Sequence, residues 1–204
     1  DLGTSDGFLA FEMEKRGATV VTVDLPCGML PDLFPLSPPP HTDPRDRVLA
    51  RLGTRRRAFW LCHRALDSHV RLHEGHVARL DGRLAGFDVA LMGNVLQHLR
   101  DPVGVLLDLA SRAETLVVTE ADWLNGTHDD APLMELFTAH LAKGNPGSWF
   151  MLSPRLVEDL LSLAGFSILG RDTHHQQYSD PTTHTTYPVR HYTITPKRTA
   201  SLTG

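Results

Sequence analysis

The chain has 204 residues, of which 41% are hydrophobic and 22% are charged, a balance typical of a soluble globular protein. Its net charge of −4 excludes a uniformly basic surface of the kind that attracts nucleic acid or anionic membranes. No apolar run approaches the roughly 18 residues that a membrane-spanning helix needs. The length predicts a single domain, residues 1–204, with a sizeable core. The charge and the lack of a long apolar run predict no membrane partner.

The opening residues, DLGTSDG at 1–7, have the composition of a turn between a buried strand and a helix. Gly3 and Gly7 allow the backbone to turn sharply and to approach a ligand closely, because neither carries a Cβ. A short helix is expected from Phe8 to Arg16. Because no strand precedes Asp1, we expect the chain to be a fragment whose N-terminal helix and first strand lie upstream.

The following elements alternate between strands and helices. TVVTVDL at Thr19–Leu25 is apolar and β-branched, which predicts a strand buried on both faces. Prolines interrupt residues 26–45, which predicts a loop, and a helix covers roughly 45–66. Further strands are expected at Val70–Leu72, Phe87–Met92, Thr115–Thr119, Phe166–Leu169 and His191–Thr195, and helices at Pro102–Ser111 and Pro154–Ala164. This alternation predicts a doubly wound, mostly parallel α/β sheet.

Two of the expected helices carry clear start signals. Asp101 and Ser153 each precede a proline, and their side-chain oxygens can accept hydrogen bonds from the free N–H groups of a first helical turn. Gly165 marks the end of the second of these helices.

Arginines gather in the helix predicted over 45–66, where Arg55, Arg56 and Arg57 adjoin Arg51 and other basic residues. One interpretation is a solvated helix face, and the other is a patch that faces RNA.

Cysteine and histidine usage limits the chemistry. Cys27 and Cys62 are too few for a disulfide framework or a metal site, and their contexts predict buried thiols. A reduced, cytoplasmic compartment is the default expectation for such cysteines. The chain's twelve histidines show no paired metal-ligand spacing, and His174–His175 stand in a polar segment that predicts a surface loop.

The opening loop and Asp24 together form the strongest functional signal. Asp24 ends the next strand roughly seventeen residues after Gly7, where a carboxylate holds the ribose hydroxyls of an adenosine ligand. A phosphate-binding loop would need Gly-Lys-Ser/Thr, which is absent, and a dinucleotide loop would need GxGxxG.

The D-x-G-x-x-x-G pattern resembles motif I of class I S-adenosylmethionine-dependent methyltransferases. FDVALMGNVLQHLRDP at 87–102 is similar to the family's fourth strand and following loop, and WFMLSPRLVEDLLSLAGF at 149–166 is similar to its late helix. AFWLCHRAL at 58–66 is closest to the subgroup related to tRNA wobble-uridine (carboxy)methyltransferases. The resemblance implies a seven-stranded Rossmann-like sheet with an antiparallel C-terminal strand pair, its first strand truncated in this chain.

The same resemblance assigns S-adenosyl-L-methionine as cofactor. Asp1 would face the methionine amino group, Asp24 the ribose, and the segment after the third strand the adenine. The implied cofactor contacts are Asp1, Gly3, Ser5, Gly7, Asp24, Leu25, His76, Val77, Gly93 and Asn94. For Asp24 the alternative is a strand-end cap, and for Gly93 and Asn94 it is a simple turn.

Three positions depart from the family's patterns. Ser5 replaces the usual middle glycine of the loop. Gln97 stands where the carboxymethyl-transferring relatives carry Tyr, which favours unmodified S-adenosylmethionine. Related O-methyltransferases carry Glu-x-x-Glu-His at this loop and bind a divalent cation there. In this chain Asn94 and Gln97 replace the two glutamates while His98 keeps the histidine, so no metal is expected.

Methyl transfer from a sulfonium depends largely on positioning, but an oxygen or nitrogen nucleophile also needs a base. His98 is the candidate base, with a structural role in its turn as the alternative. Trp149, Phe150 and Glu120 are expected to line the acceptor pocket or, in the simpler interpretation, to serve packing and strand ends.

The expected function is methyl transfer to a small molecule or a modified nucleoside. Residues 26–45 and 172–190 are expected to form the rim of the acceptor pocket. The alternatives are a tRNA wobble-uridine-modifying enzyme and a non-catalytic S-adenosylmethionine-binding domain. The net charge does not favour tRNA, whereas the arginine-rich helix does. The acceptor, its reacting atom and the oligomeric state stay open.

Overall fold

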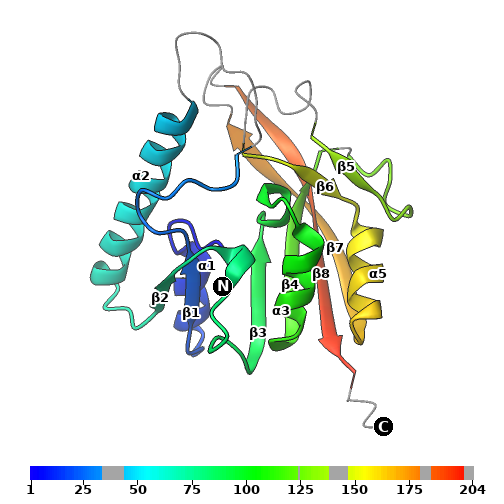
Figure 1. Cartoon of the computed structure of the whole chain (residues 1–204), viewed down its shortest axis with the longest axis horizontal. Helices are drawn as coiled ribbons and strands as arrows, with labels where there is room; N and C mark the ends of the chain where they lie inside the picture. The colour runs from blue at the N-terminus through cyan, green and yellow to red at the C-terminus, as the bar shows by residue number, and fades with distance from the viewer. Residues whose placement is uncertain (34–43, 124, 138–146, 180–184, 200–204) are drawn as a thin grey trace. The chain divides into compact units, whose positions relative to one another are not determined.

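The computed structural model describes most of the chain in two compact units (Figure 1). Unit 1 comprises residues 1–83 and 139–148, and unit 2 comprises residues 84–138 and 149–204. No helix of the described part is long and apolar enough to cross a membrane. The described residues are 1–33, 44–123, 125–137, 147–179 and 185–199.

Unit 1 pairs two parallel strands, β1 (Val21–Asp24) and β2 (Arg71–Glu74). The opening residues run alongside β1, since Leu2 forms a parallel bridge with Val23. The remaining elements of unit 1 are α1 (Phe8–Lys15), α2 (Pro44–Ala65) and the 3₁₀ turn η1 (Val77–Arg79). Three predicted elements are therefore confirmed within a few residues: the helix at Phe8–Arg16, the strand at Thr19–Leu25 and the arginine-rich helix.

Aromatic packing between α1 and α2 forms the core of unit 1. The rings of Phe11 and Phe59 lie 5.2 Å apart, and both pack with Val20 and Val70 around the strands. Phe59 belongs to an inner stripe of α2, made of Arg56, Phe59 and His63, whose spacing of three and four residues places them on one helix face. Within this mostly polar helix, the stripe faces the core.

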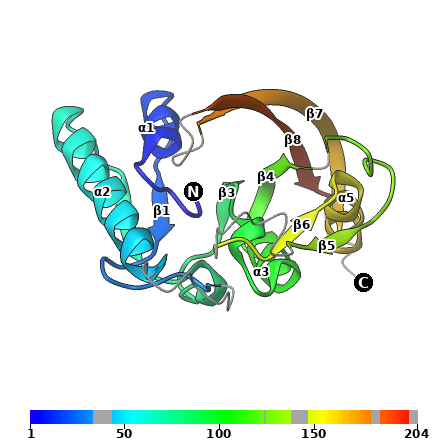
Figure 2. The ribbon, with the colours of Figure 1, turned by 90° about the horizontal axis from the view of Figure 1, so that it is seen from above.

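Unit 2 is built on a four-stranded sheet of order β3-β4-β8-β7. Strands β3 and β4 are parallel, and β8 runs antiparallel to both of its neighbours. Two helices, α3 and α5, pack against one face of this sheet (Figure 2). The elements are β3 (Phe87–Gly93), η2 (Leu96–His98), α3 (Pro102–Ala110), β4 (Ala113–Asp122), β5 (Met134–Leu136), β6 (Phe150–Leu152), α5 (Pro154–Leu163), β7 (Phe166–Ser179) and β8 (Thr186–Arg198).

Both predicted helix caps are present in unit 2. Asp101 Oδ1 accepts a hydrogen bond from the backbone N–H of Gly104 at 2.8 Å, and Ser153 Oγ accepts one from Leu156 at 3.2 Å. Gly165 has a φ of +83°, the left-handed conformation that ends α5.

The sheet differs from the expected one in two respects. The seven-stranded sheet is not confirmed, because the described strands form separate sheets of four, two and two strands. The closing antiparallel pair is present but longer than predicted, and it includes His174–His175, so the expected surface loop there is wrong. Cross-strand pairs hold this polar hairpin, such as Tyr178 with Tyr187, and apolar periodicity does not reveal them.

The cysteine prediction is also wrong, since both thiols are exposed. Cys62 lies on α2 outside the inner stripe, and Cys27 lies in the turn that follows β1. Of the predicted proline-rich loop, residues 34–43 lie outside the described residues.

Candidate functional site

The opening loop of unit 1 alternates residues in the left-handed backbone conformation. The φ angles are +71° at Gly3, +58° at Ser5 and +89° at Gly7. Ser5 thus occupies a position that favours glycine, at a cost of about 1–2 kcal/mol for an L-residue. The departure from the family's motif therefore changes the residue but keeps the backbone geometry of a glycine loop.

Asp24 connects this loop to the ends of both strands. Its Oδ2 accepts a hydrogen bond from the backbone N–H of Ser5 at 2.8 Å, and its Oδ1 accepts one from Leu25 at 2.8 Å. Its backbone oxygen accepts from Gly75, just after β2, at 2.9 Å. The structure therefore brings Ser5, Asp24 and Leu25 together at the carboxyl ends of β1 and β2, where ligands bind in α/β folds.

Arg56 also reaches this site, and the sequence analysis missed it. Its Nη2 donates to the backbone oxygen of Leu25 at 2.7 Å and lies 4.0 Å from Asp24 Oδ2. Arg56 is only 6% exposed, whereas Arg55 and Arg57 on either side are exposed. A solvated face therefore describes its two neighbours but not Arg56, and the three-and-four spacing with Phe59 and His63 was the available signal.

Several buried polar atoms around the loop have no hydrogen-bond partner among the described residues. In and beside the loop of unit 1 they are Asp1 Oδ2, Thr4 Oγ1 and Arg56 Nη1. Buried polar groups are normally paired, and leaving one unpaired costs about 1–3 kcal/mol. Three such atoms in and beside one loop are what a polar ligand site would leave unpaired in its free form.

The predicted adenine contacts follow β2 directly. His76 Nδ1 accepts a hydrogen bond from the backbone N–H of Ala78 at 3.1 Å and so caps η1. Its Nε2 lies 3.9 Å from Asp32 Oδ2. Val77 is buried beside it. This places His76 and Val77 in the turn after β2, the segment that the resemblance assigned to adenine.

In unit 2, the predicted residues Gly93 and Asn94 close β3. Gly93 pairs with Thr119 of β4, and Asn94 has a φ of +55°. Asn94 Nδ2 lies 3.4 Å from His191 Nε2, while His191 Nδ1 lies 3.0 Å from the backbone oxygen of Val189. Because that oxygen can only accept, Nδ1 carries the proton and Nε2 accepts from the amide.

His191 is a second residue that the sequence analysis missed as a site candidate. It is 5% exposed, and its burial lowers the pKa of the imidazole below 6.5. The sequence identified it only as the start of a strand, since nothing local indicates that β8 places it beside Asn94.

Glu120 has a structural role in unit 2. Its Oε1 accepts hydrogen bonds from the backbone N–H groups of Val95 and Leu96, both at 2.8 Å, so the carboxyl group of β4 holds the turn η2. Glu120 is 3% exposed, and this burial raises the pKa of its carboxyl group from 4.5 to about 7.

The remaining predicted residues of unit 2 gather around η2. Gln97 is buried, its Oε1 accepts from the Trp123 indole N–H at 3.3 Å, and its backbone oxygen accepts from the N–H of Trp149 at 2.7 Å. Phe150, the next residue, begins β6. His98 is half-buried and ends η2. Gln97, Trp149 and His98 thus lie around one turn.

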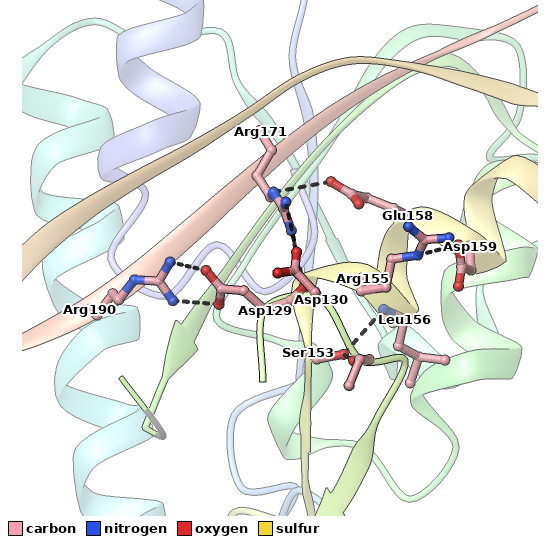
Figure 3. Close-up of polar contacts among 10 residues, drawn as sticks. Asp129, Asp130, Ser153, Arg155, Leu156, Glu158, Asp159, Arg171 and Arg190 are labelled. Atoms are coloured by element: carbon pink, nitrogen blue, oxygen red, sulfur yellow. Dashed lines mark hydrogen bonds and ion pairs between the residues drawn. The ribbon is translucent and has the colours of Figure 1, made fainter. Parts of the chain in front are cut away.

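A network of ion pairs lies elsewhere in unit 2 (Figure 3). Arg190 of β8 pairs with Asp122 and Asp129, and Arg171 of β7 lies 3.4 Å from Glu158 of α5. A small cavity beside the network is lined by Asp122, Asp129 and other residues, none of them predicted for the site. In the described part of the chain, no group of three His, Cys, Asp or Glu side chains is arranged to hold a metal ion.

Searches of protein-family models and of curated proteins found no match to the sequence. Solved structures do match. The YcgJ protein from Bacillus subtilis superposes with a TM-score of 0.63 at 12% identity, covering 98% of this chain and 91% of that chain. The N-terminal domain of EvdMO1 with bound S-adenosylhomocysteine gives 0.58 at 17% identity, covering 97% and 73%.

A third match is the 1,6-didemethyltoxoflavin-N1-methyltransferase from Burkholderia thailandensis, with 1,6-didemethyltoxoflavin and S-adenosylhomocysteine bound. Its TM-score is 0.55 at 15% identity, covering 98% of this chain and 70% of that chain. The chain shares the mixed α/β fold of these proteins. At these identities the comparison establishes the mixed α/β fold, and the activity has to be argued from the site.

Proposed function

We propose that this protein is an S-adenosylmethionine-dependent methyltransferase that binds its cofactor at the opening loop of unit 1. The observation that carries the proposal is the link between this loop and Asp24. Ser5, in its left-handed conformation, donates its backbone N–H to the carboxylate of Asp24 at the end of β1. The loop is therefore joined directly to the side chain that we expect to bind the ribose. The fold shared with a methyltransferase and with proteins that bind S-adenosylhomocysteine supports it.

The residues of unit 1 fit the chemistry of this cofactor. The unpaired Asp1 Oδ2 suits an ammonium group, and the Thr4 hydroxyl can donate to a carboxylate; the methionyl part of the cofactor carries both groups. Asp24 keeps acceptor capacity on both oxygens for ribose hydroxyls, since each accepts one N–H. We assign His76 and Val77 to the adenine.

When bound, S-adenosylmethionine supplies a methyl group that is already activated by its attachment to a sulfonium. The contribution of this chain is to hold that methyl group in line with the acceptor, and such positioning supplies much of the acceleration. We assign His98 as the base that takes the proton from an oxygen or nitrogen acceptor. Trp149 and Phe150 are assigned to the acceptor, and Gly93 and Asn94 to the cofactor.

The proposed acceptor is a small molecule or a modified nucleoside. The Burkholderia thailandensis enzyme, which methylates a small molecule, supports this class of acceptor. The half-buried indole of Trp149 has the guanidinium of Arg100 over its ring at 4.9 Å, so this surface already accommodates a planar group. An aromatic acceptor is therefore consistent with the side chains near η2.

A tRNA acceptor is the second candidate, and one feature of α2 favours it. Arg47, Arg51 and Arg55 are exposed and lie four residues apart, so they share one face of the helix. A gel shift with tRNA tests this candidate. Binding that weakens steeply with salt and is lost in Arg51→Gln/Arg55→Gln supports it, whereas no shift leaves the small-molecule acceptor.

Calorimetric titration of S-adenosylhomocysteine tests the cofactor. We expect micromolar binding by the protein, a loss of about tenfold or more in Asp24→Asn, and no change in Asp67→Asn. Asp67 is a matched control because it is an exposed aspartate that lies before β2, at the opposite strand ends from Asp24. A folded protein that binds no S-adenosylhomocysteine contradicts the proposal, and binding without transfer to any acceptor indicates the non-catalytic alternative.

A further inference from the structure

Arg56 is buried, and its contacts with Leu25, Asp24 and the Phe59 ring leave part of its guanidinium without a hydrogen-bond partner among the described residues. Taking a guanidinium out of water costs several kcal/mol, and the chain recovers this only when the group is well paired. Arg56 is 6% exposed. Its position on the inner stripe of α2, three residues before the fully buried Phe59, holds it there, so its burial follows from the packing of the helix.

The guanidinium of Arg56 is incompletely paired. Of its five N–H groups, one donates to the backbone oxygen of Leu25. The Asp24 carboxylate lies 4.0 Å from Nη2, beyond hydrogen-bond distance. Nη1 is buried and has no partner among the described residues. The guanidinium whose Nη2 lies 4.0 Å from the carboxylate assigned to the ribose therefore keeps a spare donor at Nη1.

A carboxylate and a guanidinium side by side form a matched pair for a vicinal diol. Each hydroxyl of a ribose both donates and accepts a hydrogen bond. Asp24 can accept the protons of the hydroxyls but offers no donor to their lone pairs, and Arg56 has donors but no acceptor. Together they satisfy both capacities of one hydroxyl, which neither residue does alone.

We propose that Arg56 is a cofactor-binding residue, which donates from its unpaired N–H groups to a ribose hydroxyl whose proton is accepted by Asp24. This inference rests on the proposed function, since it assigns a nucleoside ribose to the site. It makes the site selective for an intact ribose. A ligand without the contacted hydroxyl leaves a buried cation unpaired.

The test compares ligands and variants in one thermodynamic cycle. S-Adenosylhomocysteine and its 2′-deoxy and 3′-deoxy analogues are titrated into the parent protein, Arg56→Met and the matched control Arg55→Met. We expect Arg56→Met to lower the affinity for S-adenosylhomocysteine by about 10- to 100-fold, the range for a hydrogen bond to a charged group. For one deoxy analogue the same substitution is expected to change affinity by less than about threefold, and Arg55→Met to leave all three ligands unaffected.

The cycle separates binding from a purely structural role. If Arg56 only holds the Leu25 carbonyl, Arg56→Met lowers the affinity for all three ligands by the same factor, and the inference is overturned. Unchanged affinity for S-adenosylhomocysteine overturns it as well, while leaving the proposed function intact. Should Arg56→Met not fold, Arg56→Lys keeps the charge but loses the planar fork, and the same dependence on the hydroxyl is expected. If the parent protein binds none of the ligands, the proposed function itself fails.

Discussion

The two units treat buried arginine in opposite ways. In unit 2, the side chain of Arg190 is 13% exposed and pairs with Asp122 and Asp129, and these hydrogen bonds, that to Asp129 foremost, hold its pKa above the ordinary arginine value. In unit 1, Arg56 is more deeply buried but has one backbone acceptor and a carboxylate at 4.0 Å.

We interpret this difference as one of role: Arg190 stabilises the fold, whereas Arg56 is proposed to bind a ligand. A fully paired buried cation holds strands and loops together, and its loss leaves carboxylates uncompensated. An incompletely paired one costs stability, and the cost is recovered only when a ligand supplies the missing acceptor. The comparison predicts large stability effects from substitutions in unit 2 and binding effects from polar substitutions near the loop of unit 1.

The largest effect is expected for Arg190→Met. The substitution removes the guanidinium that pairs with both Asp129 and Asp122, whose side chain is 8% exposed, at a cost of about 4 kcal/mol in the free energy of unfolding. Urea denaturation measures it. Arg155→Met is the control, because Arg155 forms an exposed pair with Asp159 and is expected to show no measurable change. A change for Arg190→Met no larger than the control's would remove the contrast between the units.

The next effect concerns the pH dependence of unit 2 and isolates Glu120. Its pKa is raised in the folded protein, from 4.5 to about 7, so the folded state holds the proton more tightly than the unfolded state. The stability contributed by this group is complete below pH 4.5 and is lost as the pH rises through 7, by roughly 3 kcal/mol. His191 has the opposite sign, since its lowered pKa removes stability as the pH falls through 6.5 and below.

The comparison of the parent with Glu120→Gln cancels the contribution of His191. The N–H groups of Val95 and Leu96 donate to the single oxygen Oε1, which a glutamine retains, so the variant is expected to fold. In urea denaturation between pH 4.5 and 8, the variant gains stability relative to the parent as the pH rises. Parallel curves would show that Glu120 does not titrate in this range.

A smaller effect is expected for Gly7→Ala in unit 1. An added Cβ would lie 2.5 Å from Phe11 Cε2 and 2.6 Å from Phe59 Cδ2, in the core between α1 and α2. Together with the left-handed φ of +89°, this is expected to cost about 2–3 kcal/mol. Gly17→Ala is the control, since φ is +92° and nothing lies within 4 Å, so it reports the backbone cost alone. Equal losses in the two variants would show that the rings yield.

The sequence predicted the local features of the fold well, including the helix caps and the sharp turns of the opening loop. The caps at Asp101 and Ser153 were predictable because they depend on neighbouring residues only. Arg56 and His191 were missed because their roles depend on packing between distant elements. Arg56 looks like any residue of a basic helix until Phe59 fixes its face, and His191 meets Asn94 only through the long pairing of β8. Strand pairing is not local either, and the expected sheet of seven strands is not confirmed.

The smallest prediction concerns Ser5, where the loop keeps a left-handed φ of +58° without a glycine. Ser5→Gly relieves this strain and is expected to raise the free energy of unfolding by up to about 1 kcal/mol, while the backbone N–H still donates to Asp24. Asp67→Gly, at φ +49° in an exposed turn, serves as the control for the backbone gain alone. Stabilisation in the control but not in Ser5→Gly would mean that the serine side chain stabilises the loop. Weaker binding of S-adenosylhomocysteine by a stabilised Ser5→Gly would instead place the serine hydroxyl against the ligand, because a more stable loop with an unchanged backbone has no other reason to bind it less tightly.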